Sequence, residues 1–521
     1  MKKLLSLLLC AVLLTGCGST TITEVTTAPP APTETAPAAT PAKPIPAPEY
    51  VTRFDTVTEI ILSDDGITVN GSGETDVFTS KDIIYYEDKD TYDSGNPYGE
   101  GTDADKHTAG EAAAHTVVNI TAPGAYRISG TLSAGQIRVD LGKDAYEEAD
   151  AVAEIILSDV DITCTVAPAI LFLNTYECDG NWSADSASPD VDTTKAGANL
   201  VLEGENTVSG AYVAKIFKDK DSDKKLWKQD GAIYSYMSLN VFGPGSLTLN
   251  AANEGLDTEL HLTINGGNIT INSQNDGINT NEDGVSVTTI NGGNLSIFAG
   301  LGAEGDGIDS NGYLVINDGN VISCAKPVSD AGLDSNLGSY INGGTVIAMG
   351  ASMDWAESDS GQVTMNLQFT RQQTAGSELK ITAEDGTEIF SFTPEAEHLR
   401  GFSGLILSVP ALTRGQTCNV YIGGVQMAYT GTDVMRGPGG MPPGNPPEGF
   451  DPNGRSPRPE NFDPESMTPP EGFDGKFPEN RTPSDLPEGG FRKHGNTPAG
   501  DPRTDFYMND MVNFFSGVTA A

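Results

Sequence analysis

The sequence predicts an all-β protein built as a solenoid, in which repeated units stack and share one long core. An Ile-Asn-Gly/Asp-Gly phrase occurs four times, and its asparagines are 26, 26 and 25 residues apart: Asn265, Asn291, Asn317 and Asn342. A second phrase, an acidic residue followed by Gly-Leu/Ile-Asp/Asn-Ser/Thr, runs in step with the first, and in its fourth copy the acid, Asp330, stands one residue further upstream. Short β-branched runs dominate, and helix-period apolar stretches are scarce. A constant period with glycine-rich turns is typical of stacked β repeats.

The N-terminus predicts an exported lipoprotein. Residues 1–17 have a basic start, an apolar core from Leu4 to Leu14, and a lipobox-like Leu-Thr-Gly ending at Cys17. Cleavage before Cys17 would leave it as the lipidated residue, so the membrane contact we expect is the lipid anchor alone. The predicted localisation is extracytoplasmic, at the bacterial cell surface. A plain secretory signal with a chance cysteine is the alternative. Residues 18–50 are rich in Thr, Pro and Ala and predict an extended stalk.

The body is predicted over residues 51–350, with strands in 55–84, a loop in 87–106, irregular repeats in 115–210 and the regular repeat in 230–350. Residues 178–196 are a polar insertion. Residues 351–430 keep strand patterning without the period, which indicates a terminal β cap or small β domain. Residues 431–503 form a Pro/Gly-rich segment expected to be disordered, and the apolar segment 504–521 is expected to dock on the body. Four cysteines besides Cys17 fit either disulfides or buried thiols: Cys164, Cys178, Cys324 and Cys418.

Stacking would place acidic side chains of successive repeats about 4.8 Å apart. Three apolar stacks and an asparagine ladder accompany them. The stacks are Ile264, Ile290, Ile316 and Ile341; Ile269, Leu295, Val321 and Val346; and Leu256, Ile278, Ile308 and Leu333. Two carboxylates ~5 Å apart repel by roughly 3 kcal/mol at an effective dielectric constant of 20. Lys326 is the only Lys or Arg between Gly231 and Thr370. Oxygen ligands at this spacing favour calcium, and the predicted ligands are Glu254, Asp257, Asp276, Asn279, Asp306, Asp309, Asp330 and Asp334.

Charge excludes one class of partner. The formal net charge is -42, whereas a nucleic-acid binder that neutralises phosphates needs a basic face. A further acidic run from Asp219 to Asp230 resembles the start of an EF-hand loop, but Lys224 stands where the sharp turn needs Gly. We interpret this run as a solvated insertion.

The residues that carry a family resemblance are Ala122 to Leu132, Gly135-Gln136-Ile137 and the two repeated phrases. Over roughly Thr116 to Gly350 the chain resembles the carbohydrate-binding β-helix domains of bacterial surface proteins, which are related in fold to calcium-dependent polysaccharide lyases. The resemblance implies a right-handed parallel β-helix that holds calcium and binds plant cell-wall polysaccharides such as cellulose or pectic acids. Many relatives have Lys where Asp257, Asn279, Asp309 and Asp334 stand here, which favours calcium further.

Three functions remain open at this point. A lyase needs a Lys or Arg as base, and Lys326 is the candidate in the repeats. A cellulose binder needs aromatic side chains, for which Tyr313 and Tyr340 are candidates that could equally pack in the core. The hypothesis we favour is a non-catalytic, lipid-anchored binder of acidic glycans that uses calcium. The third function is a surface scaffold or adhesin whose Pro/Gly-rich segment binds a protein partner.

Overall fold

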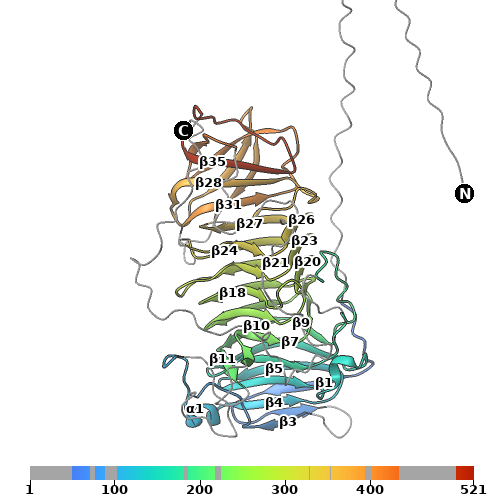
Figure 1. Cartoon of the computed structure of the whole chain (residues 1–521). Helices are drawn as coiled ribbons and strands as arrows, with labels where there is room; N and C mark the ends of the chain where they lie inside the picture. Colours follow the sequence, from blue (N-terminus) through green and yellow to red (C-terminus); the bar gives the residue numbers. More distant parts are fainter. Residues whose placement is uncertain are drawn as a thin grey trace, which may run out of the picture. The chain divides into compact units, whose positions relative to one another are not determined.

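The computed structural model describes residues 50–70, 77–87, 102–180, 186–217, 225–327, 329–351, 354–393, 401–432 and 500–521. Cys17 and nearly all of the Pro/Gly-rich segment lie outside these residues. Almost all regular structure is β-strand, so the all-β prediction is confirmed (Figure 1). Within the described residues, helical structure is limited to α1 (Ala109–Ala114) and a 3-10 turn at Ala145–Glu147. None of the described helices has the length and apolar composition needed to cross a membrane.

Most strands before residue 351 pair in parallel, in three ladders. Ladder 1 contains β4 (Thr116–Ile120), β6 (Gly135–Asp140), β8 (Ile170–Asn174), β13 (Gly231–Ser235), β16 (Glu254–Thr258), β19 (Ile278–Thr280), β22 (Ile308–Ser310) and β25 (Leu333–Ser335). Ladder 2 contains β1 (Val57–Leu62), β5 (Gly124–Leu132), β7 (Ala153–Cys164), β9 (Ala198–Glu203), β14 (Leu239–Phe242), β17 (Leu262–Ile264), β20 (Val287–Ile290), β23 (Tyr313–Ile316) and β26 (Gly338–Ile341).

Ladder 3 starts from the end of β7 and contains β10 (Glu205–Gly210), β15 (Ser246–Ala251), β18 (Asn268–Ser273), β21 (Asn294–Phe298), β24 (Asn320–Cys324) and β27 (Thr345–Gly350). Each sequence repeat from residue 254 onward therefore supplies one strand to each ladder. Figure 1 shows these strands stacked one above another. Four further strands lie outside the ladders. β2 (Thr68–Asn70) pairs antiparallel with β1, β3 (Val77–Ser80) pairs antiparallel with β4, and β11 (Val213–Phe217) pairs antiparallel with β12 (Lys225–Gln229) as a hairpin.

The three predicted apolar stacks are confirmed. Ile264, Ile290, Ile316 and Ile341 are aligned partners on ladder 2 and are fully buried. The stacks that begin at Leu256 and Ile269 are likewise aligned and buried on ladders 1 and 3. Each such side chain contributes roughly 1.5–3 kcal/mol to folding through removal from water. Apolar burial at the same place in every repeat keeps the strands in one register.

The asparagine ladder is also confirmed. Nδ2 of Asn291, Asn317 and Asn342 each donates a 2.9 Å hydrogen bond to Oδ1 of the asparagine one repeat earlier. The glycine two residues after each asparagine has positive φ, and at Gly293 (φ 93°) an added Cβ would lie 2.8 Å from the carbonyl oxygen of Gly267. Glycine is needed there because an L side chain rarely adopts this conformation and has no room.

The part after residue 351 differs in pairing. Its strands are β28 (Thr364–Gln373), β29 (Leu379–Ala383), β30 (Glu388–Phe392), β31 (Phe402–Ser408), β32 (Thr417–Ile422), β33 (Val425–Ala428), β34 (Phe506–Tyr507) and β35 (Val512–Ala520), which we call the cap. Antiparallel pairing dominates, and β31 joins the cap to β27. The C-terminal strand β35 pairs parallel with β28 and antiparallel with β33, and it buries Phe515 and Val518. The last residues of the chain therefore form part of the cap core.

Candidate metal centre

Ladder 1 aligns the acidic phrase of the repeats. Strand register makes Asp257, Asn279, Asp309 and Asp334 successive neighbours on β16, β19, β22 and β25. Three positions upstream, the same register aligns Glu254, Asp276 and Asp306. The fourth place in that upstream row belongs to Ala331, because the amide of Gly307 donates to its carbonyl.

The expectation that Asp330 completes the upstream row is therefore wrong. The cause is the extra residue between Asp330 and Gly332, which moves the carboxylate one position out of register. Asp330 instead accepts hydrogen bonds from the Gly305 amide at 2.9 Å and from the Ser329 hydroxyl at 2.8 Å.

Three carboxylates meet where the regular repeat begins. Oxygens of Asp230, Glu254 and Asp257, which we call the carboxylate cluster, all lie within 4.8 Å of one another. Asp230 immediately precedes β13, while Glu254 and Asp257 are on β16, the next strand of ladder 1. Glu254 is 5% exposed and Asp257 is 0% exposed. Among the described residues, these three acids lie close enough to one another to ligate one ion.

Several oxygens at the cluster are buried without a hydrogen-bond donor. They are Oε2 of Glu254, Oδ2 of Asp257 and Oδ1 of the neighbouring Asn279. The other carboxylate oxygen of Asp257 accepts a hydrogen bond from Nδ2 of Asn281. Each buried acceptor without a partner costs about 1–3 kcal/mol. A bound cation would remove this cost, because it interacts directly with such oxygens.

Electrostatics at the cluster oppose full ionisation. Burial raises the pKa of Glu254, and the nearby Asp230 raises it further while Lys228 opposes the shift. The pKa of Asp257 is raised well above its usual value by burial and by the Glu254 carboxylate. Without a bound cation, the two side chains therefore favour sharing a proton.

Lys228 provides a positive charge that the sequence analysis missed. Its Nζ lies 2.7 Å from Oδ2 of Asp230, and the two side chains are 14% and 15% exposed. Burial alone would lower the pKa of Lys228, but the surrounding carboxylates, with Asp230 foremost, raise it well above the usual value. The expectation that Lys326 is the one cation near the acids is therefore wrong. Lys228 stands three residues before Gly231, on strand β12 of the hairpin, which brings its side chain to the cluster.

The remaining predicted ligands lie along ladder 1 outside the carboxylate cluster. Asp276 Oδ1 accepts from the Asp306 amide at 2.7 Å, and Asp306 accepts from the Ala331 amide. Burial, with smaller contributions from neighbouring carboxylates, raises the pKa values of Asp306 and Asp309 to about 7. Asp354, which lies beyond the repeats, faces Asp334, and burial followed by that charge raises its pKa to about 7.

The sequence contains a signal for Asp230 but none for Asp354. Asp230 lies three residues before Ile233, which is the same spacing as that of Asp330 before Leu333. Ile233 aligns with Leu256 on ladder 1, so this spacing is the sequence signal for Asp230. Asp354 comes close to Asp334 only through the turn into the cap. Asp230 also ends the run that we interpreted as a solvated insertion; residues 218–224 of that run lie outside the described residues.

The other candidate binding residues do not join the cluster. Lys326 is half-buried, and its Nζ donates to the Gly302 carbonyl at 3.3 Å. Tyr313 and Tyr340, on neighbouring strands of ladder 2, have ring centroids 6.0 Å apart and are both partly exposed. The four cysteines left open between disulfides and thiols are free: Cys164, Cys178, Cys324 and Cys418.

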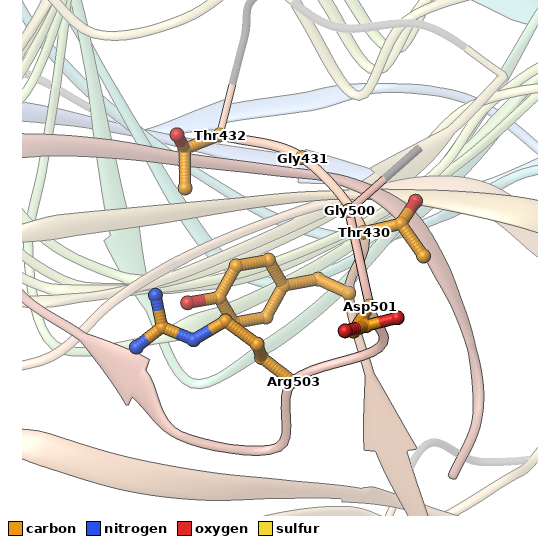
Figure 2. Close-up of a pocket in the computed structure, with 7 residues that line it drawn as sticks. Thr430, Gly431, Thr432, Gly500, Asp501 and Arg503 are labelled. Carbon is orange, nitrogen blue, oxygen red and sulfur yellow. The ribbon is translucent and has the colours of Figure 1, made fainter. Parts of the chain in front are cut away.

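A cavity of about 280 Å³ lies in the cap, away from the predicted site residues (Figure 2). It is lined by Tyr429, Thr430, Gly431, Thr432, Gly500, Asp501 and Arg503. The Arg503 guanidinium lies 5.8 Å from the centroid of the Tyr429 ring and is paired with Asp505. These mutual contacts explain the arrangement as packing between two chain segments, and no site is assigned to it.

Parallel ladders with a buried carboxylate cluster define an all-β protein with a candidate site for a hard cation. Residues 114–388, a little over half of the chain, match a family described as carbohydrate-binding domain-containing protein. The chain belongs to this family. One relative, a carbohydrate-binding domain-containing protein of Acetivibrio thermocellus, is 33% identical over 153 residues, which are 29% of this chain and 43% of the relative. The chain thus spans less than half of the length of that relative.

A solved structure also shows a likeness to this chain. It is a gadolinium derivative of the polysaccharide lyase-like protein from C. thermocellum, and it is 22% identical with a TM-score of 0.31. The likeness covers 56% of this chain and 93% of that one. At this TM-score it supports no inference about the present protein.

Proposed function

We propose that this protein is a non-catalytic carbohydrate-binding protein whose glycan recognition depends on calcium. Carbohydrate binding in the broad sense follows from the family. The observation that supports calcium is the set of buried oxygens without donors at Glu254, Asp257 and Asn279. Three carboxylates with a nearby amide oxygen are a donor set that suits calcium, which takes oxygen ligands at about 2.3–2.6 Å.

The proposed ion has a structural role as well. Asp230, Glu254 and Asn279 belong to three successive levels of ladder 1, so one ion would join consecutive repeats. We infer that the three ladders are the faces of a right-handed parallel β-helix. The constant period and the parallel register support this inference.

The proposed glycan is a plant cell-wall polysaccharide, either a pectic acid or cellulose. Calcium would offset the repulsion between an acidic glycan and a chain of net charge -42, which favours the pectic acid. The test is a pull-down with insoluble polygalacturonate or cellulose, with calcium or with chelator. We expect retention on polygalacturonate in calcium and loss in chelator. Equal retention under both conditions would remove calcium from the proposal.

A lyase is the second candidate, because Lys228 lies beside the carboxylate cluster. A base must be uncharged to accept a proton, and the carboxylates around Lys228 raise its pKa, which keeps it protonated. We therefore expect that incubation with polygalacturonate and calcium gives no ultraviolet-absorbing unsaturated product. Formation of that product, abolished by Lys228→Met, would establish the enzyme instead.

Attachment to the membrane through Cys17 is part of the proposal. The lipobox-like sequence supports it, and the Thr/Pro/Ala stalk would hold the body away from the surface. The test is expression of the full chain in a bacterium with radiolabelled palmitate. Cys17→Ala should abolish labelling and release the protein from the membrane fraction. Labelling that survives the substitution would contradict the anchor.

A further inference from the structure

Lys228 places an ammonium group where the proposed calcium ion would be bound. Its Nζ is 2.7 Å from Oδ2 of Asp230, and both side chains are largely buried. The ammonium also interacts with Glu254, Asp257 and Glu259. Calcium bound to Asp230 at about 2.3–2.6 Å would lie within a few ångströms of this ammonium. Two cations this close repel each other strongly in a partly buried site.

The ammonium leaves part of the cluster unsatisfied. Oε2 of Glu254 and Oδ2 of Asp257 have no donor although Lys228 is nearby. One positive charge also faces four carboxylates, of Asp230, Glu254, Asp257 and Glu259. The Lys228 ammonium therefore balances only part of the negative charge, and it leaves these two oxygens available to a cation of higher charge.

We propose that Lys228 is a built-in competitor for calcium: the ion enters the carboxylate cluster as the ammonium leaves Asp230, so Lys228 weakens calcium binding. This inference rests on the proposed calcium site. Calcium affinity rises with the net negative charge of the ligand set, and extracellular modules work at dissociation constants of about 10⁻⁴–10⁻³ M. Lys228 reduces the net negative charge of the cluster by one, which weakens calcium binding toward that range. In the calcium-free protein it also partly neutralises the buried acids.

The test is calorimetric titration of the full chain with calcium, comparing the wild type, Lys228→Met and Lys195→Met. Lys195 is exposed, so its variant makes the same change in net charge away from the cluster. We expect the dissociation constant of Lys228→Met to fall at least about tenfold, and that of Lys195→Met to stay at the wild-type value. Equal or weaker binding by Lys228→Met would overturn the inference.

The outcomes separate this inference from the proposed function. Calcium binding of equal strength in the wild type and Lys228→Met overturns the inference alone. If Lys228→Met binds calcium and the wild type does not, the result supports the inference and contradicts calcium dependence in the natural protein. No binding by either contradicts both. If Lys228→Met folds only when calcium is present, while the wild type folds in chelator, the ammonium replaces the ion and the inference holds. Failure to fold in millimolar calcium overturns it.

Discussion

At the scale of single residues, the carboxylate cluster combines groups that would destabilise one another without a cation. Glu254 and Asp257 are buried, their pKa values are raised, and each has an oxygen without a donor. Hydrogen bonding to Asn281 satisfies only one oxygen of Asp257. The cluster is thus costly to fold when empty, which is typical of a site whose ligand contributes to stability.

Replacing Glu254 by glutamine should have opposite effects with and without calcium. In chelator the amide removes a buried charge beside Asp257, so Glu254→Gln should melt at the wild-type temperature or above. In calcium the wild type should become more stable, whereas the variant should gain little because it has lost a ligand. Thermal melts by circular dichroism at several calcium concentrations measure both effects. Glu205→Gln, at an exposed position, is the control and should keep the full calcium response.

A row of carboxyl groups with raised pKa values makes a prediction for pH. Burial, together with neighbouring carboxylates, raises the pKa values of Asp306, Asp309 and Asp354 to about 7, from an ordinary value of 3.8. Between these values the folded protein binds more protons than the unfolded chain, so stability rises as pH falls. In chelator, the melting temperature should therefore increase from pH 8 to pH 5. Asp354→Asn should reduce this increase, and exposed Asp65→Asn should not. A melting temperature that falls over this range would contradict the assignment.

At the scale of elements, the asparagine ladder allows a matched comparison. Asn317 on the turn after β23 donates to Asn291 and accepts from Asn342, each at 2.9 Å, and is partly buried. Asn294 on β21 makes two similar bonds, to Asn268 and from Asn320, but is exposed. Asn317→Ala should cost about 1–2 kcal/mol of unfolding free energy, and Asn294→Ala clearly less, because water replaces its partners. Urea denaturation gives both values; equal costs would mean that burial does not matter here.

At the scale of the whole molecule, the cap closes through the C-terminal strand. Thr430 and Gly500 are hydrogen bonded at 3.2 Å, and Tyr429 pairs with Arg503, so the Pro/Gly-rich segment leaves and re-enters the cap at one place. Beyond it, Phe506, Phe515 and Val518 are buried in the cap core. This segment is therefore an insertion between two parts of one structural unit.

Two deletions should therefore behave differently. Replacing residues 433–499 by a short Gly/Ser linker should leave the melting temperature and glycan retention unchanged, because the flanking residues are already adjacent. Truncation after Thr432 should destabilise the cap strongly, since it removes β34 and β35 and exposes aromatic side chains. Thermal melts and glycan pull-downs measure the difference. If the internal deletion abolishes glycan retention, the inserted segment takes part in binding. If it abolishes capture of a protein partner, the scaffold hypothesis gains support.

The periodic part of this protein could be predicted residue by residue. Ile264, Ile290, Ile316 and Ile341 recur at intervals that only stacked strands explain, and so do the asparagines beside them. The same register correctly aligned Asp257 with Asn279. It misplaced Asp330, because Ala331 separates this residue from Gly332 and shifts its carboxylate one position along the chain. It also missed Lys228, which belongs to the hairpin β11–β12 and to no repeat, and Asp230, which immediately precedes β13.

The sequence by itself determined the all-β class, the strand register of the repeats and the alignment of acids on ladder 1, because these depend on local periodicity and on short-range turns. Tertiary structure alone decided which acids meet around one point, which lysine faces them and which segment completes the cap. Those contacts join residues far from the repeat pattern, such as Lys228 with Glu254 and β35 with β28. Periodicity has no signal for such pairs, since burial and charge balance select them only after the chain has folded.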